Sequence, residues 1–503
     1  MIGRSKAIAL AGLSGHVVEV EAHLAASLPA FTIVGLPDAS LQESRDRVRA
    51  AVTSSALDWP TRRITVNLSP ASLPKSGSTT DLAIAVAILA AAGAVEAKRA
   101  AGAVYLGELG LDGAVRPVRG VLPAVAAAVA AGLPHVVVPS ANAAEARLVD
   151  GAQVTAVGSL GELAQLLGNE HAVPAPASVV RTAPEQPLPF EPPDMTDVRG
   201  QETARFALEA AAAGGHHLLM VGPPGAGKTM LAARLPGLLP DLAADDAVAA
   251  TSVHSLCGTF DPEAGLLRRP PFEAPHHSAS AAAIVGGGAM LARPGAISRA
   301  HAGVLFLDEA PEFPARVLDT LRQPLESGEV VLHRAHGAAR YPARFQLVLA
   351  ANPCPCGNRG VRGTQCTCSP IVCRRYMGRL SGPLLDRIDI RIDVAPVRRG
   401  APEGESTAAV AERVARARRA ARVRLEGTAW TVNSQVGARW LRSNTPPRAL
   451  ERAQGALDRG VVSARGLDRA LRVAWSLADL EGAPVPSAEH VQEALSLRTG
   501  GVT

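Results

Sequence analysis

A glycine-rich run of eight residues is the part of the chain best suited to chemistry. It follows an apolar stretch at 217–221, precedes a helical pattern at 230–238, and reads Gly222, Pro223, Pro224, Gly225, Ala226, Gly227, Lys228 and Thr229. In a strand–loop–helix setting, the backbone N–H groups of such a loop surround phosphate groups at the start of the helix. Lys228 is then expected to contact the β- and γ-phosphates of ATP, and the Thr229 hydroxyl to bind Mg²⁺. The run therefore predicts a site for ATP and Mg²⁺.

Two carboxylates and one amide follow the next apolar runs of the chain. The run at 304–307 ends in Asp308 and Glu309, and the run at 345–350 ends just before Asn352. A buried strand that delivers two carboxylates at its end suits metal binding and water activation. We expect Asp308 to lie near Mg²⁺, Glu309 to polarise the attacking water, and Asn352 to orient the same water. Together with the glycine loop, these residues predict hydrolysis of ATP.

Arginines near the C-terminus are candidates for stabilising the transferred phosphate. Arg387 is predicted to end a short helix, from which it could reach the γ-phosphate on a neighbouring subunit; the alternative is a local ion pair with Asp386 or Asp389. Three further arginines recur at spacings of four and three: Arg465, Arg469 and Arg472. Arg472 is the best candidate among them for contacting the nucleotide, and a solvated helix face suits the other two.

Five of the six cysteines lie within twenty residues. They are Cys354, Cys356, Cys366, Cys368 and Cys373. In a chain expected to be cytosolic, such clustering favours a metal over disulfides. Four thiolates suit tetrahedral zinc, although a one-residue gap within each pair is tighter than the usual two to four. Reduced loop thiols without a metal are the alternative.

The chain reads as several domains. Residues 1–168 mix short strands with helices and predict an α+β domain, whereas 169–195 are rich in proline and predict a linker. Strands and helices alternate through 196–395, as an α/β unit should. After a loop, 405–503 reads almost entirely helical.

Composition gives weaker information on location and partners. The formal net charge of the 503 residues is +5, and only four of the 51 basic residues are lysines. This excess fits a polyanionic partner, but a compositional preference for arginine would explain it equally well. No apolar run reaches the ~18–20 residues of a membrane helix, and the first residues do not resemble a signal peptide. We therefore expect a cytoplasmic protein without a membrane segment.

Several unusual strings give the chain a family resemblance. They are GLPD at 35–38, ESRDRVR at 43–49, APHHS at 274–278, VGGG at 285–288, NPCPCG at 352–357, SGPLLDRID at 381–389 and ADLEG at 478–482. Over essentially its full length, the chain resembles the AAA+ ATPases of the magnesium-chelatase-related YifB/ComM group. Cys354, Cys356, Cys366 and Cys368 match the cysteine positions of that group, and Cys373 looks like an addition.

The resemblance implies an assembly and a substrate. It implies a hexameric ring in which Arg387 acts in trans as an arginine finger and Asn352 acts as sensor 1. The C-terminal helices would form a lid of the magnesium-chelatase type. The ComM branch implies a DNA helicase that promotes branch migration, linked to recombination of incoming DNA.

Two insertions bear on that implied function. Lys228 and Asp308 are 80 positions apart, far more than the dozen or so residues of a simple crossover, and the extra segment resembles a helix-2 insert. Residues 329–345 are predicted to form two strands and resemble a pre-sensor-1 hairpin. This hairpin carries His333, Arg334, His336, Arg340 and Tyr341. Cationic and aromatic side chains suit contact with a DNA backbone without reading sequence; a solvated basic hairpin is the alternative.

The N-terminal domain is similar to the Lon-protease domain, which has a ribosomal-S5-like fold. The similarity rests on PKSG at 74–77 and on residues 107–117. Thr79 stands at about the position of the Lon serine, and Leu122 stands near that of its lysine. Because both halves of the dyad are missing, we expect a scaffold without protease activity, serving ring assembly or DNA contact.

Other functions compete with that of a DNA motor. A chelatase-type ATPase that drives metal insertion is one, although the chain shows no porphyrin site and no Asp-x-Ser-x-Ser metal motif. An ATP-dependent protease is disfavoured by the missing dyad. An assembly or chaperone ATPase stays open.

Overall fold

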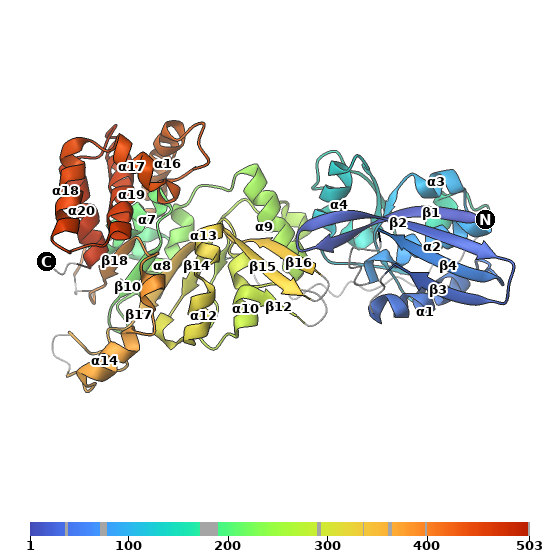
Figure 1. The fold of residues 1–503 in the computed structure, drawn as a ribbon, viewed down its shortest axis with the longest axis horizontal. Coiled ribbons are helices and arrows are strands. Elements are labelled where there is room, and N and C mark those ends of the chain that lie inside the picture. The colour runs from blue at the N-terminus through green and yellow to red at the C-terminus, as the bar shows by residue number, and fades with distance from the viewer. Residues whose placement is uncertain are drawn as a thin grey trace.

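Three regions follow one another along the long axis of the molecule (Figure 1). The computed structural model describes residues 1–35, 39–70, 78–171, 190–288, 293–334, 337–360, 365–397 and 400–500. Most of the predicted linker lies outside these residues, as do the PKSG string and the end of GLPD. The predicted class, a multidomain α/β protein with a helical C-terminal region, is confirmed.

The N-terminal region is built on a mixed sheet of seven strands in the order β3-β4-β2-β1-β5-β8-β9. The strands are β1 (Ile2–Ala11), β2 (Ser14–Ala25), β3 (Ala30–Val34), β4 (Arg63–Ser69), β5 (Val104–Tyr105), β8 (His135–Pro139) and β9 (Gln153–Val157), and β6 (Glu108–Leu109) pairs with β7 (Val115–Arg116) in a separate ribbon. The helices are α1 (Ala39–Ser54), α2 (Asp81–Ala92), α3 (Ala97–Ala101), α4 (Val121–Ala130), α5 (Ala143–Ala146) and α6 (Leu160–Leu166). Helix α2 is apolar around its whole circumference and is accordingly buried on all sides.

The central region contains a parallel sheet of five strands in the order β11-β14-β17-β10-β18. They are β10 (Leu218–Val221), β11 (Phe272–Glu273), β14 (Val304–Leu307), β17 (Gln346–Ala351) and β18 (Ile390–Asp393). Their apolar sequences fit a sheet that is covered on both faces. Because all strands are parallel, the loops that follow them gather at one edge, here called the carboxyl edge, and those that precede them gather at the amino edge.

The strands of this sheet are joined by long connections that contain helices, an insertion and a hairpin. Its flanking helices are α7 (Glu202–Gly214), α8 (Lys228–Leu238), α12 (Ala315–Thr320), α13 (Pro324–Ser327), α14 (Pro370–Met377) and α15 (Gly382–Leu385). The insertion within the span from Lys228 to Asp308 forms α9 (Ala244–Cys257), α10 (Ala281–Val285), β12 (Gly286–Gly287), β13 (Arg293–Pro294) and α11 (Ala296–Arg299). The two strands predicted at 329–345 are present as an antiparallel hairpin, β15 (Glu329–Arg334) and β16 (Gly337–Pro342).

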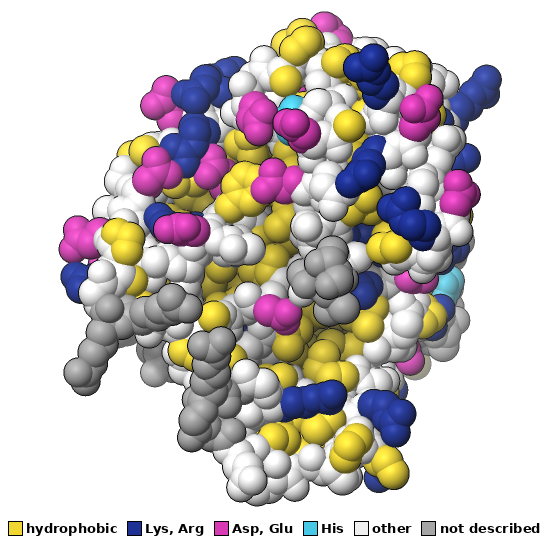
Figure 2. All heavy atoms as spheres, turned by 90° about the vertical axis from the view of Figure 1, so that its left-hand side faces the viewer, with side chains coloured by type: hydrophobic (Ala, Val, Ile, Leu, Met, Phe, Trp, Pro, Cys, Tyr) yellow, Lys and Arg dark blue, Asp and Glu magenta, His cyan; other side chains and the backbone are white. Residues whose placement is uncertain are grey.

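The C-terminal region is helical and shares one hydrophobic core with the central sheet. Its helices are α16 (Thr407–Arg424), α17 (Ala438–Asn444), α18 (Pro447–Asp458), α19 (Ala464–Glu481) and α20 (Ala488–Thr499). On the end of the molecule that faces the viewer in Figure 2, hydrophobic side chains gather in a band across the middle, with charges of both signs around it. Among the described residues, no helix combines the length and the apolar character that crossing a membrane requires.

The N-terminal region contacts the central region directly. The turn between β1 and β2 lies against β16, where the Leu13 amide donates to the Arg340 carbonyl at 3.4 Å. Gly12 sits in the left-handed region (φ +69°) so close to the Arg340 backbone that any side chain there would overlap it. Next to this contact, Ser255 on α9 donates a hydrogen bond to the buried carboxylate of Glu145.

Candidate functional site

The predicted phosphate loop connects β10 to α8 at the carboxyl edge. Gly225 and Gly227 adopt left-handed conformations (φ +74° and +86°) that let the loop turn tightly before α8 begins. The ammonium of Lys228 donates to the carbonyl oxygens of Gly222 (2.7 Å) and Pro223 (2.9 Å) and to Asn352 Oδ1 (3.1 Å). Burial lowers the pKa of Lys228, and the charges of the nearby carboxylates oppose that shift. The structure thus joins two predicted residues that are 124 positions apart in the chain.

The predicted magnesium ligands meet at the same edge. Thr229 Oγ1 donates to Asp308 Oδ2 at 2.6 Å, and the other Asp308 oxygen accepts the Glu309 amide at 2.9 Å. A hydroxyl and a carboxylate are oxygen ligands of the kind that Mg²⁺ prefers. The donor set therefore fits a magnesium ion at this position.

Glu309 has a partner that the sequence did not assign to the site. Its backbone is left-handed (φ +49°), and its Oε2 lies 3.3 Å from Nδ1 of His277, which comes from the insertion. The His277 ring stands 4.0 Å from that of His276 and edge-on to the buried Phe313. The APHHS string marked this segment as unusual, but nothing in the string pointed to Glu309.

A second residue missed by sequence is Gln201, which precedes α7 with φ +51°. Its amide nitrogen donates to the Ala226 carbonyl in the phosphate loop (2.6 Å) and to the Ala395 carbonyl (3.1 Å). Its amide oxygen is buried and has no hydrogen-bond partner among the described residues. Gln201 also lines a cavity of about 230 Å³, together with Arg199, Gly200, Glu202, Thr203, Ala204, Asp393, Val394, Ala395, Pro396, Val397 and Ala401. A ligand group could therefore extend from the loop into this cavity.

Arg387 does not reach the phosphate loop of its own chain. It lies just before β18, hence at the amino edge, and its side chain is largely buried. It pairs with Glu326 and donates to the Pro383 carbonyl at 2.6 Å. The alternative of an ion pair with Asp386 or Asp389 is wrong, since the carboxylate it contacts belongs to α13.

Arg472 is placed away from the loop as well, which corrects the expectation that it contacts the nucleotide of its own chain. It donates to the Val436 carbonyl at 2.8 Å and lines a cleft of about 560 Å³. His217 and Gln346, at the starts of β10 and β17, line the same cleft. Arg472 therefore lies at the amino edge, and the phosphate loop at the carboxyl edge.

Asp389 is the buried carboxylate that contacts the basic residues of this cleft. It is fully buried, its Oδ1 lies 2.6 Å from Arg469 Nη1, and its Oδ2 accepts the His217 amide at 3.1 Å. Burial by itself would raise the pKa of Asp389, but the Arg469 charge and the His216 ring, whose Nδ1 lies 3.6 Å from Asp389 Oδ2, hold it well below its usual range. Burial lowers the pKa of His217 to about 4. Of the three arginines spaced along α19, Arg469 is thus a structural partner and not part of a solvated face.

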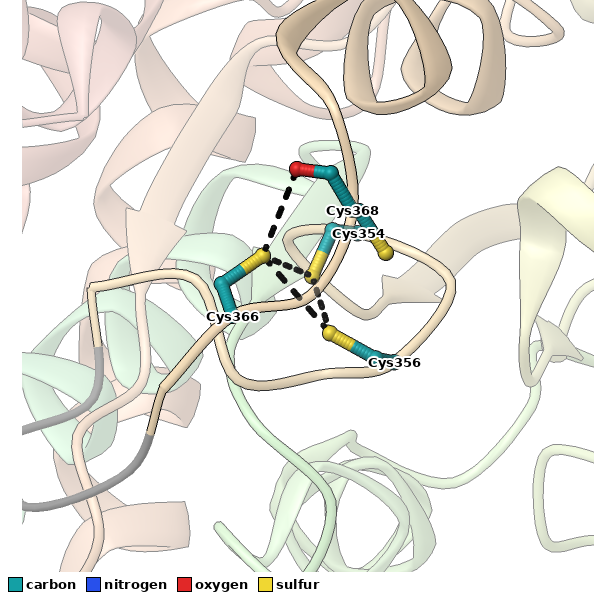
Figure 3. A group of neighbouring side chains, drawn as sticks. All are labelled: Cys354, Cys356, Cys366 and Cys368. Atoms are coloured by element: carbon teal, nitrogen blue, oxygen red, sulfur yellow. Dashed lines mark hydrogen bonds between the residues drawn. The ribbon is translucent and has the colours of Figure 1, made fainter.

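Four of the five clustered cysteines converge, as Figure 3 shows. Their sulfur atoms all lie within 4.8 Å of one another. Cys354 Sγ is 3.4 Å from Cys356 Sγ and 3.7 Å from Cys366 Sγ. Zinc–sulfur bonds of ~2.3 Å in a tetrahedron place sulfurs about 3.8 Å apart, so the donor set fits zinc. Cys373 stands outside the group, with its sulfur 4.0 Å from the Cys368 carbonyl.

The predicted DNA hairpin is described only in part. His333 is exposed, and Arg340 is largely exposed while paired with Glu329 at 2.8 Å. The side chain of Arg334 and the whole of His336 lie outside the described residues. Tyr341 is only 3% exposed, because it shares the inward face of the hairpin with its cross-strand partner Val330. The expectation that this ring is presented to DNA is therefore wrong.

Comparison with known proteins places this site in a family. Family models described as magnesium chelatase, subunit ChlI; subunit ChlI of Mg-chelatase; and magnesium chelatase, subunit ChlI C-terminal match residues 194–401, 20–142 and 404–498. An uncharacterized protein of Mycobacterium tuberculosis is 52% identical over 99% of both chains. YifB of Escherichia coli and the competence protein ComM of Haemophilus influenzae are 40% and 41% identical, each over 97% of this chain and 95% of the relative.

A more distant relative matches only part of the chain. The magnesium-chelatase 38 kDa subunit of Rhodobacter capsulatus is 30% identical over 31% of this chain and 48% of its own. The matches over nearly the whole chain include the YifB and ComM proteins. The chain belongs to the YifB/ComM family of magnesium-chelatase-related proteins.

Proposed function

We propose that the protein is an AAA+ motor that hydrolyses ATP and acts on DNA, most specifically a hexameric helicase that promotes branch migration in recombination or uptake of DNA. The observation that carries the ATPase part is the pair of contacts at the carboxyl edge, Lys228 with Asn352 and Thr229 with Asp308. The family is magnesium-chelatase-like, in keeping with ATP and Mg²⁺.

Each residue of the carboxyl edge has a role in this proposal. Lys228 exchanges its loop carbonyls for the β- and γ-phosphates, and the loop N–H groups surround them. Thr229 and Asp308 would hold Mg²⁺, which when bound would supply positive charge beside the phosphates. Glu309 takes the proton of the attacking water, and Asn352 orients that water.

The cavity beside Gln201 is the proposed site for the base. It adjoins the phosphate loop through the Gln201–Ala226 hydrogen bond. The unpaired amide oxygen of Gln201 supplies an acceptor for a donor on the ligand. The cavity is too small for the whole nucleotide but suits a planar base.

Assembly into a ring is proposed from Arg387. Its Nε is buried without a partner among the described residues, and the residue lies at the opposite sheet edge from its own loop. A second subunit that brought its carboxyl edge to this arginine would complete the transition-state contacts. The apolar band in Figure 2 is the kind of surface that a neighbour covers.

DNA is proposed as the substrate on which the motor works. The support is the exposed position of His333 and Arg340 on a hairpin next to the insertion, together with the name of the relative ComM, a competence protein. Arginine and histidine side chains on such a hairpin contact phosphates without selecting a sequence. The N-terminal region, similar to a Lon domain, is proposed as a scaffold without protease activity.

A chelatase-type motor that drives metal insertion is the second candidate, because the matching family models are those of a magnesium-chelatase subunit. Zinc is proposed as a further metal, on the cysteine geometry described above.

A single set of assays tests these proposals. The ATPase rate and strand displacement are measured with single-stranded, forked and four-way junction DNA, and Lys228→Ala serves as the inactive control. We expect branched DNA to raise the rate and strands to be displaced by the wild type alone. If ATP is hydrolysed but no DNA changes the rate, the DNA proposal fails and a chelatase-type or assembly ATPase takes its place. If the wild type and Lys228→Ala are equally inactive, the ATPase proposal itself fails.

A further inference from the structure

We infer that a zinc ion held by Cys354, Cys356, Cys366 and Cys368 clamps the phosphate loop and Asn352, so that this thiolate site governs ATP hydrolysis from outside the nucleotide site. The inference rests on the proposed ATPase function, and it goes beyond a zinc site that merely stabilises a surface loop. It is carried by what the cysteine segment touches.

The first step is that the four sulfurs are held as a ligand set and not as disulfides. The Sγ–Sγ separations among Cys354, Cys356 and Cys366 are 3.4 to 3.7 Å, and the Cys368 sulfur lies within 4.8 Å of each of them. These separations are far longer than the ~2.05 Å of a disulfide, and the three shorter ones are close to the edge of a zinc tetrahedron. Cys354 is fully buried, so its sulfur is withheld from solvent. Four thiols this close would repel one another once ionised, and a divalent cation removes that repulsion.

The second step is that the cluster joins two elements of the site. Cys354 and Cys356 follow the end of β17 by only a few residues, whereas Cys366 and Cys368 lead into the N-terminus of α14. A metal at their centre therefore ties the end of β17 to α14. Such a tie restricts the segment between them in the way that any cross-link restricts a loop.

The third step is that the tied segment rests on the phosphate loop. Gly357 adopts a left-handed conformation (φ +76°), and any side chain there would overlap the ring of Pro224. Asn352, two residues before Cys354, accepts the hydrogen bond from Lys228. The segment that carries the cysteines thus contacts the loop both near its start and at its lysine.

The fourth step concerns α14 itself. Tyr376, on the buried side of this helix, lies close to the backbone of Asn352. Asn352 therefore lies between β17, which precedes it, and α14, which the cysteines attach. Loss of the metal would let α14 move. Asn352 would then be held less firmly, and Gly357 would no longer be held against Pro224.

The experiment compares cysteines inside and outside the cluster. Zinc content, ATPase kinetics and hydrogen exchange of residues 222–229 are measured for the wild type, Cys366→Ser and Cys373→Ser. Cys373 is a matched control, since it is a buried cysteine on α14 that stands outside the sulfur group. We expect about one zinc per chain in the wild type and in Cys373→Ser. Cys366→Ser is expected to lose zinc, lower kcat roughly 10-fold and exchange faster in the loop.

A second measurement guards against a variant that fails to fold. Zinc is removed from the wild type with a chelator and then restored, and cobalt is added in its place to record thiolate-to-cobalt absorption. Recovery of kcat and of slow loop exchange on adding zinc back supports the clamp. A wild type that lacks zinc after careful purification overturns the metal assignment.

The outcomes separate this inference from the proposed function. If zinc is lost and both kcat and loop exchange stay unchanged, the clamp is overturned while the ATPase stands. If the wild type hydrolyses no ATP, the proposed function fails, and loop exchange with and without zinc still decides whether the metal clamps the loop.

Discussion

The two edges of the five-stranded sheet are built in opposite ways. At the carboxyl edge, Lys228 bonds to Asn352 and Thr229 bonds to Asp308. At the amino edge, Arg387 and Arg472 are bonded to residues that take no part in either pair. Both edges derive from the same strands, so the separation is set by which end of each strand carries the residue.

One chain brings together only some of the residues predicted to act in ATP hydrolysis. Lysine, hydroxyl, carboxylates and amide lie together, and the arginines expected to stabilise the transferred phosphate lie at the far ends of the strands. In the proposed ring, such a site would be completed when one subunit offers its amino edge to the carboxyl edge of another. Nucleotide binding and nucleotide hydrolysis should then respond differently to assembly.

The largest expected effect comes from Arg387→Ala. In a ring, we expect kcat to fall by about 10³-fold while the affinity for ATP changes little, because the arginine acts only in the transition state. Mixing Arg387→Ala subunits with inactive Lys228→Ala subunits should restore part of the activity at interfaces that carry both intact residues. The control is Glu326→Gln, which removes the partner of Arg387 and keeps the arginine. Absence of any restoration on mixing would contradict a divided site.

Asp389, the buried carboxylate at the amino edge, should contribute more to the free energy of unfolding than a neighbouring, less buried carboxylate. Asp389→Asn leaves the partly buried Arg469 without its fully buried charge partner, and we expect the free energy of unfolding to fall by about 3–5 kcal/mol. Chemical denaturation followed by circular dichroism measures this change. The half-buried Asp386, three residues earlier, is the control, and Asp386→Asn should lower the free energy of unfolding far less. An equal decrease in both variants would contradict a special role for Asp389 in the cleft.

The amino edge should also be the acid-sensitive edge. Burial lowers the pKa of both His217 and His301 to about 4, and the Nδ1 of each accepts a backbone N–H. Between about pH 6.5 and pH 4 the unfolded chain therefore binds protons that the folded chain does not. Stability is full above about pH 6.5 and falls as pH drops, by ~1.4 kcal/mol per pH unit for each histidine. Denaturation at several pH values measures the slope, and His301→Gln should remove about half of it; an unchanged slope would refute this assignment.

At the carboxyl edge, His277→Ala should reduce kcat roughly 10-fold with little change in KM, because Glu309 keeps its backbone position and loses the group that orients its side chain. The effect should disappear in a Glu309→Gln background. His276→Ala is the matched control, since that ring lies against His277 and forms a hydrogen bond with Ser278 instead of contacting Glu309. A loss of equal size in both variants would point to collapse of the segment and not to orientation of Glu309.

The smallest effect on stability is expected for Arg340→Ala. The Arg340–Glu329 pair is on the surface, so its loss should change the free energy of unfolding by less than ~1 kcal/mol. DNA binding, in contrast, should weaken for all sequences alike, and its salt dependence should fall by about one counterion. Arg4→Ala removes a similar surface pair with Glu21 and serves as the control. If both variants bind DNA as the wild type does, the hairpin is not the contact.

Sequence predicts the carboxyl edge well because its residues directly follow apolar runs. Asp308 and Asn352 each come after a buried strand, and a parallel sheet necessarily brings such positions to one edge. The hairpin was predictable for a similar reason, since alternation and a short turn are local features. These signals lie within a few residues of the groups they position.

The remaining contacts depend on packing over long separations. Gln201 bonds to the backbone carbonyl of Ala395, and Arg387 pairs with Glu326. No spacing in the sequence predicts either contact. The prediction that Arg472 contacts the nucleotide was wrong because a helical spacing defines a face of the helix. It does not say which edge of the sheet that face covers. The prediction that Tyr341 faces DNA was wrong because alternation along a strand shows which residues share a face. It does not show which of the two faces packs against the rest of the protein.

The contact between Gly12 and Arg340 has a mechanical consequence. Strand β16 cannot shift relative to the N-terminal region unless the Leu13–Arg340 hydrogen bond breaks or the whole region follows. A load applied at the hairpin would therefore reach a folded body of about 170 residues as well as the nucleotide site. In the proposed motor, the N-terminal region would thus anchor the hairpin on the side away from the nucleotide site.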